Sequence, residues 1–320
     1  MSYASARSID ALDIPVIDIG PLRDGSDLEG VAKALHRASR EVGFLYVSGH
    51  GIPDARLKAA RDTALGFFRG DAAVKDSVRI SAKHRGWLAA GGAKMQDDAK
   101  PDLKESFIWG FQDAKGATPE DHALRGANVW PPAMPALESA AMGWFADAHA
   151  VAGHLMRGFA AGLGLAPDFF TGQGGAPMSR ASFVYYPPQP ETAGAEQFGV
   201  GPHTDFGVLT VLAQDDVGGL QVQTLGGDWV AAPPIPGTLV INVGDLLARW
   251  TNDVYRSTPH RVVNASGQER LSLVLAYDPE PETPIDPRAV FGDAVATAHA
   301  PITCGDYLEW RFAKAFSYRK

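Results

Sequence analysis

Apolar residues recur with two different spacings along this chain, one helical and one strand-like. In the first half they recur about every three or four residues, which is typical of helices that bury one face. Helices are predicted after the Ser-Asp-Leu-Glu capping box at 26–29, over 54–68 and over 137–163. Between the first two helices, the apolar run 42–48 is predicted as a strand.

The second half contains short β-branched and aliphatic runs separated by Gly and Pro, which predict the strands of a compact barrel or sandwich. These runs lie at 208–213, 220–224, 238–243, 261–263 and 271–277. Residues 69–118 are less periodic, and we predict loops around one strand at 106–112. A last helix is predicted over 306–315.

Composition narrows the class of protein. A chain of 320 residues that is 45% hydrophobic and 21% charged can bury one large core, and we expect a single domain over 1–320. A net charge of −8 argues against a nucleic-acid partner. The single cysteine, Cys304, excludes an internal disulfide and fits a reducing compartment. Without a signal-peptide pattern or a membrane-length apolar run, we expect a cytoplasmic protein with no membrane partner. The oligomeric state stays open.

Three side chains form a candidate metal site. His203 and Asp205 are two residues apart, so at a strand end their side chains project from the same face. His260 lies far enough along the chain for a second strand to return beside the first. Two imidazoles and one carboxylate on one side of a divalent metal, with the other side open, form the facial triad of non-heme Fe(II) oxygenases.

Shortly after His260, Arg270 and Ser272 share one face of a predicted strand. The planar guanidinium fork of Arg270 matches a carboxylate, and the Ser272 hydroxyl adds a further hydrogen bond. A metal triad followed by such a clamp suits a keto acid whose keto-acid end chelates iron while its distal carboxylate is anchored. Pairing of Arg270 with a surface Asp is the alternative.

Several long motifs lie along nearly the whole chain. They are Ile-Pro-Val-Ile-Asp at 14–18, Val-Gly-Phe-Leu-Tyr-Val at 42–47, Tyr-Tyr-Pro-Pro at 185–188, Gly-Pro-His-Thr-Asp at 201–205, Gly-Gly-Leu-Gln-Val at 218–222, Asn-Val-Gly-Asp at 242–245 and Thr-Pro-His-Arg at 258–261. In these motifs and their order the chain resembles the Fe(II)/2-oxoglutarate-dependent dioxygenases of the isopenicillin N synthase type.

The resemblance implies a mainly β fold with flanking helices. Its core is a distorted double-stranded β-helix, or jelly roll, expected at 180–282, after a helix-rich α/β region at 1–118 and before a C-terminal helix at 305–320. The implied cofactors are Fe(II), 2-oxoglutarate and O2. The implied reaction couples oxidative decarboxylation of 2-oxoglutarate, which gives succinate and CO2, with hydroxylation or desaturation of a small organic substrate.

Two alternatives stay open at this point. One is an iron-dependent oxidase of the same fold that does not use 2-oxoglutarate, like isopenicillin N synthase or the plant ethylene-forming oxidase. The other is a non-catalytic metal-binding module, or a hydrolase that uses the same triad for zinc.

The resemblance also implies contacts beyond the triad and the clamp. Tyr186 occupies the position whose hydroxyl helps to hold the distal carboxylate of 2-oxoglutarate, and the apolar Val184 departs from the Asn that is usual in plant relatives. Aromatic side chains near the C-terminus are expected to close over the barrel mouth; they are Tyr307, Trp310, Phe312 and Phe316. Candidate substrate contacts, each of which core packing or solvation could equally explain, are Arg85, Trp87, Phe107, Trp109, Phe183, Phe206 and Trp250.

Overall fold

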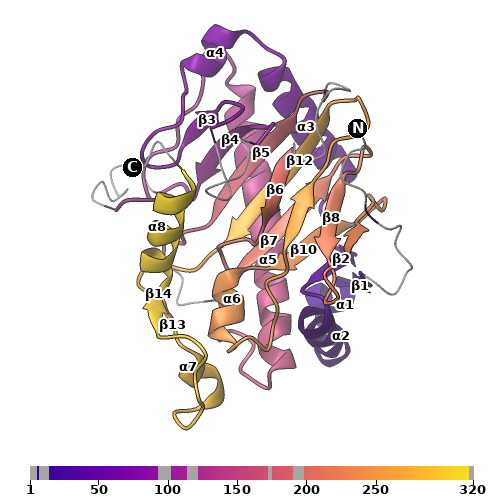
Figure 1. Ribbon diagram of the computed structural model, residues 1–320, viewed down its shortest axis with the longest axis vertical. Coiled ribbons are helices and arrows are strands. Elements are labelled where there is room, and N and C mark those ends of the chain that lie inside the picture. The colour runs from indigo at the N-terminus through magenta and orange to yellow at the C-terminus, as the bar shows by residue number, and fades with distance from the viewer. Residues whose placement is uncertain are drawn as a thin grey trace.

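Two β-sheets form a barrel at the centre of the molecule (Figure 1). The structure is a computed structural model, and it describes residues 6, 14–92, 102–113, 122–171, 175–189 and 198–316. The larger sheet has eight strands. In spatial order they are β1 (Val16–Asp18), β2 (Phe44–Ser48), β10 (Leu239–Val243), β7 (Leu209–Gln214), β12 (Arg270–Tyr277), β5 (Arg180–Tyr186), β4 (Glu105–Gly110) and β3 (Gly86–Leu88). β1 and β2 pair in parallel, and the other neighbouring strands of this sheet pair antiparallel.

The smaller sheet has four antiparallel strands. In spatial order they are β6 (Val200–His203), β11 (His260–Val262), β8 (Leu220–Gln223) and β9 (Trp229–Ala231). A separate two-stranded pair joins β13 (Pro284–Ile285) to β14 (Ile302–Thr303).

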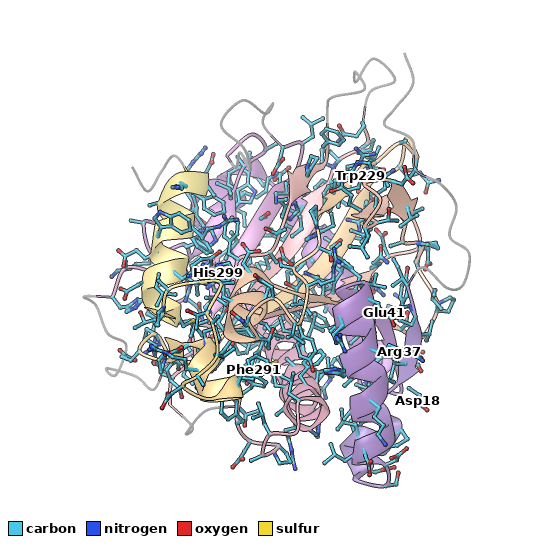
Figure 2. The ribbon with its side chains drawn as sticks, turned by 60° about the horizontal axis from the view of Figure 1, so that its bottom comes forward. Asp18, Arg37, Glu41, Trp229, Phe291 and His299 are labelled. Atoms are coloured by element: carbon cyan, nitrogen blue, oxygen red, sulfur yellow. The ribbon has the colours of Figure 1, made fainter. Side chains whose placement is uncertain are left out.

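Helices α2, α3 and α5 pack against the large sheet. The helix bounds are α1 (Gly20–Asp24), α2 (Leu28–Glu41), α3 (Asp54–Phe68), α4 (Ala72–Asp76), α5 (Ala136–Gly162), α6 (Asp245–Trp250), α7 (Pro287–Phe291) and α8 (Cys304–Ala315). The long helix α5 packs against α2, α3 and strands of the large sheet. In Figure 2, α2 with Arg37 and Glu41 and the C-terminal α8 lie on opposite sides of the molecule. No described helix has both the length and the apolar character needed to cross a bilayer.

The period-2 alternation of the strands separates two apolar cores. On β12, Leu271, Leu273 and Leu275 pack into the core between the large sheet and the helices. Phe44 of β2 and Val222 of β8 belong to a second apolar cluster, which includes residues of both sheets and therefore fills the barrel interior. Because both faces of the large sheet are covered, its strands are apolar on both sides.

The predicted helices and most predicted strands are confirmed to within a few residues. At the start of α2, the prediction of a cap at Ser26 was wrong, because the Asp27 side chain accepts the hydrogen bond from the Gly30 backbone N–H and is the N-cap. Between 69 and 118 the structure contains α4 and β3, where only loops were expected, and β4 ends two residues earlier than predicted. β3 has three residues, too few for a clear alternation.

Candidate active site

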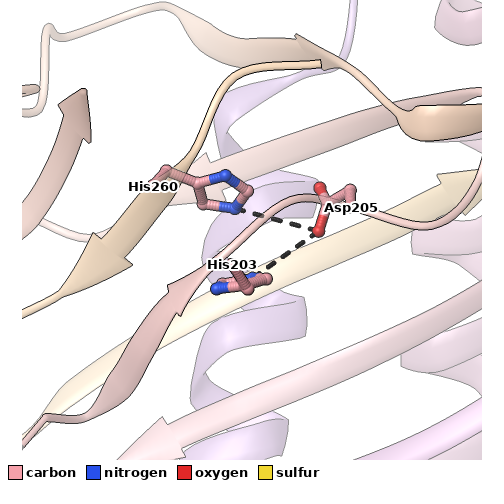
Figure 3. A group of neighbouring side chains, drawn as sticks. All are labelled: His203, Asp205 and His260. Atoms are coloured by element: carbon pink, nitrogen blue, oxygen red, sulfur yellow. Dashed lines mark ion pairs between the residues drawn. The ribbon is translucent and has the colours of Figure 1, made fainter. Parts of the chain in front are cut away.

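Strand pairing brings His203 and His260 together. β6 ends at His203, β11 begins at His260, and the two residues are partners in the antiparallel β6–β11 pair, with ring centroids 4.2 Å apart. Asp205 follows β6, and its Oδ1 lies 3.7 Å from His203 Nε2 and 3.8 Å from His260 Nε2 (Figure 3). One ligand atom from each residue lies within 4.8 Å of the others, a spacing that one metal ion could bridge.

Backbone carbonyls orient both imidazoles. His203 Nδ1 lies 2.8 Å from the Gly201 carbonyl oxygen, and His260 Nδ1 lies 3.2 Å from the Thr258 carbonyl oxygen. A carbonyl oxygen can only accept, so each Nδ1 carries the proton and donates it. Each Nε2 therefore keeps its lone pair for a metal, as expected of ligand histidines held by a second hydrogen bond.

The carboxylate of Asp205 is oriented in the same manner. Its Oδ2 accepts hydrogen bonds from Thr210 Oγ1 at 2.5 Å and from Asn242 Nδ2 at 2.7 Å. Its Oδ1 is the oxygen that faces the two imidazoles. Hydrogen bonds on one oxygen thus leave the other available as a metal ligand.

Electrostatics favour the protonation states that a metal requires. Burial, followed by the neighbouring His260, lowers the pKa of His203 to about 3. Burial alone would raise the pKa of Asp205, but the nearby His260 and His203 and the hydrogen bonds from Asn242 and Thr210 outweigh it and lower the pKa. At neutral pH, His203 is therefore neutral and Asp205 is ionised, as ligands must be.

Arg270 and Ser272 meet inside the barrel as a clamp. Arg270 is 1% exposed, its Nη1 donates to Ser272 Oγ at 2.7 Å, and its Nε donates to the Gly218 carbonyl at 2.5 Å. Its Nη2 is buried without a hydrogen-bond partner, and among the described residues no carboxylate lies within ion-pair distance of it. A buried cation is costly unless it is paired, so this arrangement fits an anionic ligand.

A glycine pair shapes the turn that supports Arg270. Gly218 and Gly219 have φ values of +81° and +91°, in the left-handed region that other residues rarely adopt. A Cβ atom on Gly219 would lie 2.4 Å from the Val263 carbonyl oxygen. The pair therefore allows the close turn that presents the Gly218 carbonyl to Arg270.

Tyr186 lies beside Arg270, its partner in the β5–β12 pair. The Arg270 guanidinium carbon is 4.7 Å from the centroid of the Tyr186 ring, which is a cation–π contact. The structure thus places Tyr186 at the clamp through its ring. A hydrogen bond from its hydroxyl to a bound carboxylate stays a prediction.

The triad and the clamp line one cavity of about 220 Å³. Alternate residues of β5 and β12 form one wall, and Val184 is among them. Arg270 opposes Tyr186, and Arg180 opposes Ala276, so the two arginines lie at opposite ends of this strand pair. One end of the cavity therefore holds the clamp and the other end holds Arg180.

Most of the predicted substrate contacts lie outside this cavity. Phe206 lines it, whereas Phe107, Trp109 and Phe183 belong to the helix-side core. On β4 the residues that line the cavity are Ser106 and Ile108, so the prediction chose the wrong face of the strand. Two further tryptophans are also buried elsewhere: Trp87 donates to Glu105, and Trp250 packs against Phe170.

Arg85 was predicted to pair with a substrate carboxylate, but it does not line the cavity. It is 3% exposed and donates to the carbonyls of Lys83 and His84. Arg180, which the prediction missed, does line the cavity. The alternation of side chains along the strand could have identified Arg180, because residues 180, 182, 184 and 186 share one face of a strand and Tyr186 was already assigned to the site.

The C-terminal helix closes one side of the cavity. Phe312 and Phe316 line it, as predicted for the aromatic residues of this helix. Tyr307 instead donates to Asp245, and Trp310 is 47% exposed. Two of the four predicted aromatic residues therefore cover the site.

Comparisons with known proteins agree with this geometry. Residues 178–279 match the family model of the 2OG-Fe(II) oxygenase superfamily, and residues 14–133 match that of the N-terminal region named for non-haem dioxygenase in morphine synthesis. A homoarginine-6-hydroxylase from Glycine max is 35% identical over 297 residues, which cover 87% of this chain and 89% of that protein. Validamycin A dioxygenase from Streptomyces hygroscopicus subsp. limoneus is 34% identical over 293 residues, which cover 86% of this chain and 80% of that protein.

A solved structure is similar throughout. It is that of a full-length Neurospora crassa protein, crystallised in complex with alpha-KG, which is 2-oxoglutarate. The two structures align with a TM-score of 0.83 and 29% sequence identity, and the alignment covers 98% of this chain and 100% of that chain. This likeness confirms the expected jelly-roll fold. Together these relatives favour the use of 2-oxoglutarate over the alternatives that do without it. The chain belongs to the 2OG-Fe(II) oxygenase superfamily and is an Fe(II)/2-oxoglutarate-dependent dioxygenase.

Proposed function

We propose that His203, Asp205 and His260 hold the ferrous ion, and that Arg270 and Ser272 bind the distal carboxylate of 2-oxoglutarate. Three protein ligands leave coordination positions for 2-oxoglutarate and O2. When bound, iron and 2-oxoglutarate supply the oxidising chemistry, in which 2-oxoglutarate is converted to succinate and CO2 while the organic substrate is oxidised.

One observation carries the assignment of the clamp. The buried Arg270 has no carboxylate partner among the described residues, and it lines the same cavity as the triad. A dianion that reaches from the metal to Arg270 would neutralise this charge and satisfy its free Nη2. The ring of Tyr186 lies against the guanidinium in a cation–π contact.

The protein's further contribution is positioning. Asn242 and Thr210 hold Asp205 so that Oδ1 faces the metal position. Apolar residues line the same cavity as the triad and the clamp, which favours a site with little water; they are Val184, Leu212, Leu220, Val262 and Val274.

We propose hydroxylation of a small organic molecule as the reaction. The relatives support this class, because one is named homoarginine-6-hydroxylase, and the Neurospora crassa protein has also been crystallised with alpha-KG and thymine. The volume of the cavity, about 220 Å³, suits a small molecule rather than a macromolecule.

The test separates binding from turnover. Titration calorimetry should detect 2-oxoglutarate binding to the Mn(II)-loaded wild-type protein, and the Fe(II) enzyme should release succinate under air. Asp205→Ala should bind Mn(II) weakly and release no succinate. Failure of the loaded wild-type protein to bind 2-oxoglutarate, or full succinate release by Asp205→Ala, would contradict the proposal.

A further inference from the structure

A second buried arginine lies at the far end of the cavity. Arg180 is the first residue of β5, shares a strand face with Tyr186, and is 6% exposed. It lines the cavity beyond the triad, opposite Ala276 of β12. The cavity therefore has a guanidinium at each end, and the proposed role of Arg270 accounts for one of them.

The contacts of Arg180 hold it in place without using all its donors. Its Nη2 lies 3.2 Å from Asp278 Oδ2, and its Nη1 donates to the Met178 carbonyl at 3.2 Å. Its guanidinium carbon lies 4.6 Å from the ring centroid of Phe312. A guanidinium has five N–H donors, so these contacts leave donors for a ligand in the cavity.

The surroundings of Arg180 carry surplus positive charge. A Cβ atom on Gly110 would lie 2.2 Å from Arg85 Nη2, and Gly110 is the β4 partner of Arg180, so the two arginines are neighbours. Arg125 pairs with Asp113, and Arg180 pairs with Asp278. Within the part of the chain that the structure describes, Arg85 has no carboxylate within ion-pair distance.

The pKa of Arg85 reflects this surplus. Burial, followed by the charges of Arg180 and Arg125, lowers the pKa of Arg85 to about 9. An anion in the cavity beside Arg180 would offset the repulsion among these three guanidinium groups.

Apolar side chains near Arg180 contribute to the cavity lining; they are Leu88, Ile108, Phe206, Phe312 and Phe316. His84, which packs against Phe312 and Phe316, and Lys104 also line the cavity. Such a wall binds an aliphatic or ring-bearing body, and a single charged group at its end fixes the orientation of that body.

We propose that the substrate is a small carboxylic acid with an apolar body, whose carboxylate binds Arg180 at the end of the cavity remote from Arg270. This inference rests on the proposed function, because it takes the Arg270 end to be filled by 2-oxoglutarate. The planar fork of Arg180 matches a carboxylate, and Ser182, which lies on the same strand face and lines the cavity, offers a further hydroxyl. The apolar body then lies between Ile108 and Phe312, beside the triad.

The test compares acids with their neutral amides on protein loaded with Zn(II) and 2-oxoglutarate. Saturation-transfer NMR would measure binding of hexanoate, cyclohexanecarboxylate and 3-phenylpropanoate, each beside its primary amide. We expect the acids to bind at least about tenfold more tightly than the amides, because a hydrogen bond between two charged groups is stronger than one to a neutral amide. Arg180→Gln should abolish this preference without changing the affinity for 2-oxoglutarate.

Two further variants guard against a purely structural effect. Arg180→Lys keeps a cation beside Asp278 but loses the fork, and should bind the acids with intermediate affinity. Arg157→Gln removes an exposed arginine of α5 and should behave as wild type. Circular dichroism melting would establish that each variant is folded.

The contrary outcomes are distinct. Equal binding of amides and acids, the absence of any acid binding, or acid binding that survives Arg180→Gln would overturn the inference. Failure of the metal-loaded wild-type protein to bind 2-oxoglutarate would contradict the proposed function instead.

Discussion

The side-chain amide of Asn242 donates a hydrogen bond to Oδ2 of Asp205 across 2.7 Å. Asn242 belongs to β10 of the large sheet, and Asp205 follows β6 of the small sheet. This contact therefore connects the two sheets at the triad. It couples the packing of the barrel to the direction in which the Asp205 carboxylate points.

Asn242→Leu is expected to weaken metal binding. The substitution removes one of the two hydrogen bonds to Asp205 Oδ2, so the carboxylate can rotate, and partners of this kind typically contribute about 10–100-fold in metal affinity. Competition with a fluorescent chelator for Mn(II) measures the affinity. Thr210→Val should act in the same direction, and Thr238→Val, in an exposed turn, is the matched control. Unchanged affinity in both site variants would show that Asp205 does not need this support.

Arg270→Lys is expected to weaken 2-oxoglutarate binding by about 1–3 kcal/mol. Lysine keeps the charge but loses the fork that contacts Ser272, Gly218 and the proposed carboxylate. Titration calorimetry on the Mn(II)-loaded protein measures the change, while Mn(II) affinity itself should stay the same. If Arg270→Lys binds 2-oxoglutarate as wild type does, the anchor of the distal carboxylate lies elsewhere.

Phe107 and Ile108 are adjacent on β4 but face different environments. Phe107→Ala should lower the free energy of unfolding by about 3–5 kcal/mol, because it opens a void in the helix-side core. Ile108→Ala should lower it less and should act mainly on the KM for the organic substrate. Urea unfolding of both variants tests this. Equal loss of stability together with an effect of Phe107→Ala on KM would place the cavity on the other face.

His149 predicts a pH dependence of stability away from the active site. It lies between Phe145 and Tyr277, and burial lowers its pKa below the ordinary 6.5. As the pH falls below 6.5, His149 is protonated in the unfolded chain but stays neutral in the folded chain, which favours unfolding. The contribution of neutral His149 to the free energy of unfolding is therefore complete above pH 6.5 and is lost as the pH falls. His149→Phe should therefore lose less stability than wild type between pH 7.5 and pH 5.5 in urea unfolding. An equal loss in the two proteins would rule out His149 as a source.

The candidate metal ligands could be predicted from sequence because their signal is local. The two-residue spacing of His203 and Asp205 predicts side chains on one face at a strand end, and the residues around His260 match a long motif. The long helix α5 was equally clear, because its apolar stripe continues over 27 residues. Short elements such as β3 gave no comparable signal, since three residues cannot display an alternation.

The sequence by itself therefore predicted the fold class, through its strand pattern and its family resemblance, and it proposed the candidate ligand set and the candidate clamp, because His203 with Asp205 and Arg270 with Ser272 are each two residues apart. Only the tertiary structure decided which face of β4 lines the cavity. Both faces of this strand are covered, one by helices and the other by the barrel interior, so apolar side chains occur on both and alternation alone is ambiguous. The position of Arg85 outside the cavity, beside Gly110, the β4 partner of Arg180, likewise depends on strand register, which distant parts of the chain establish together.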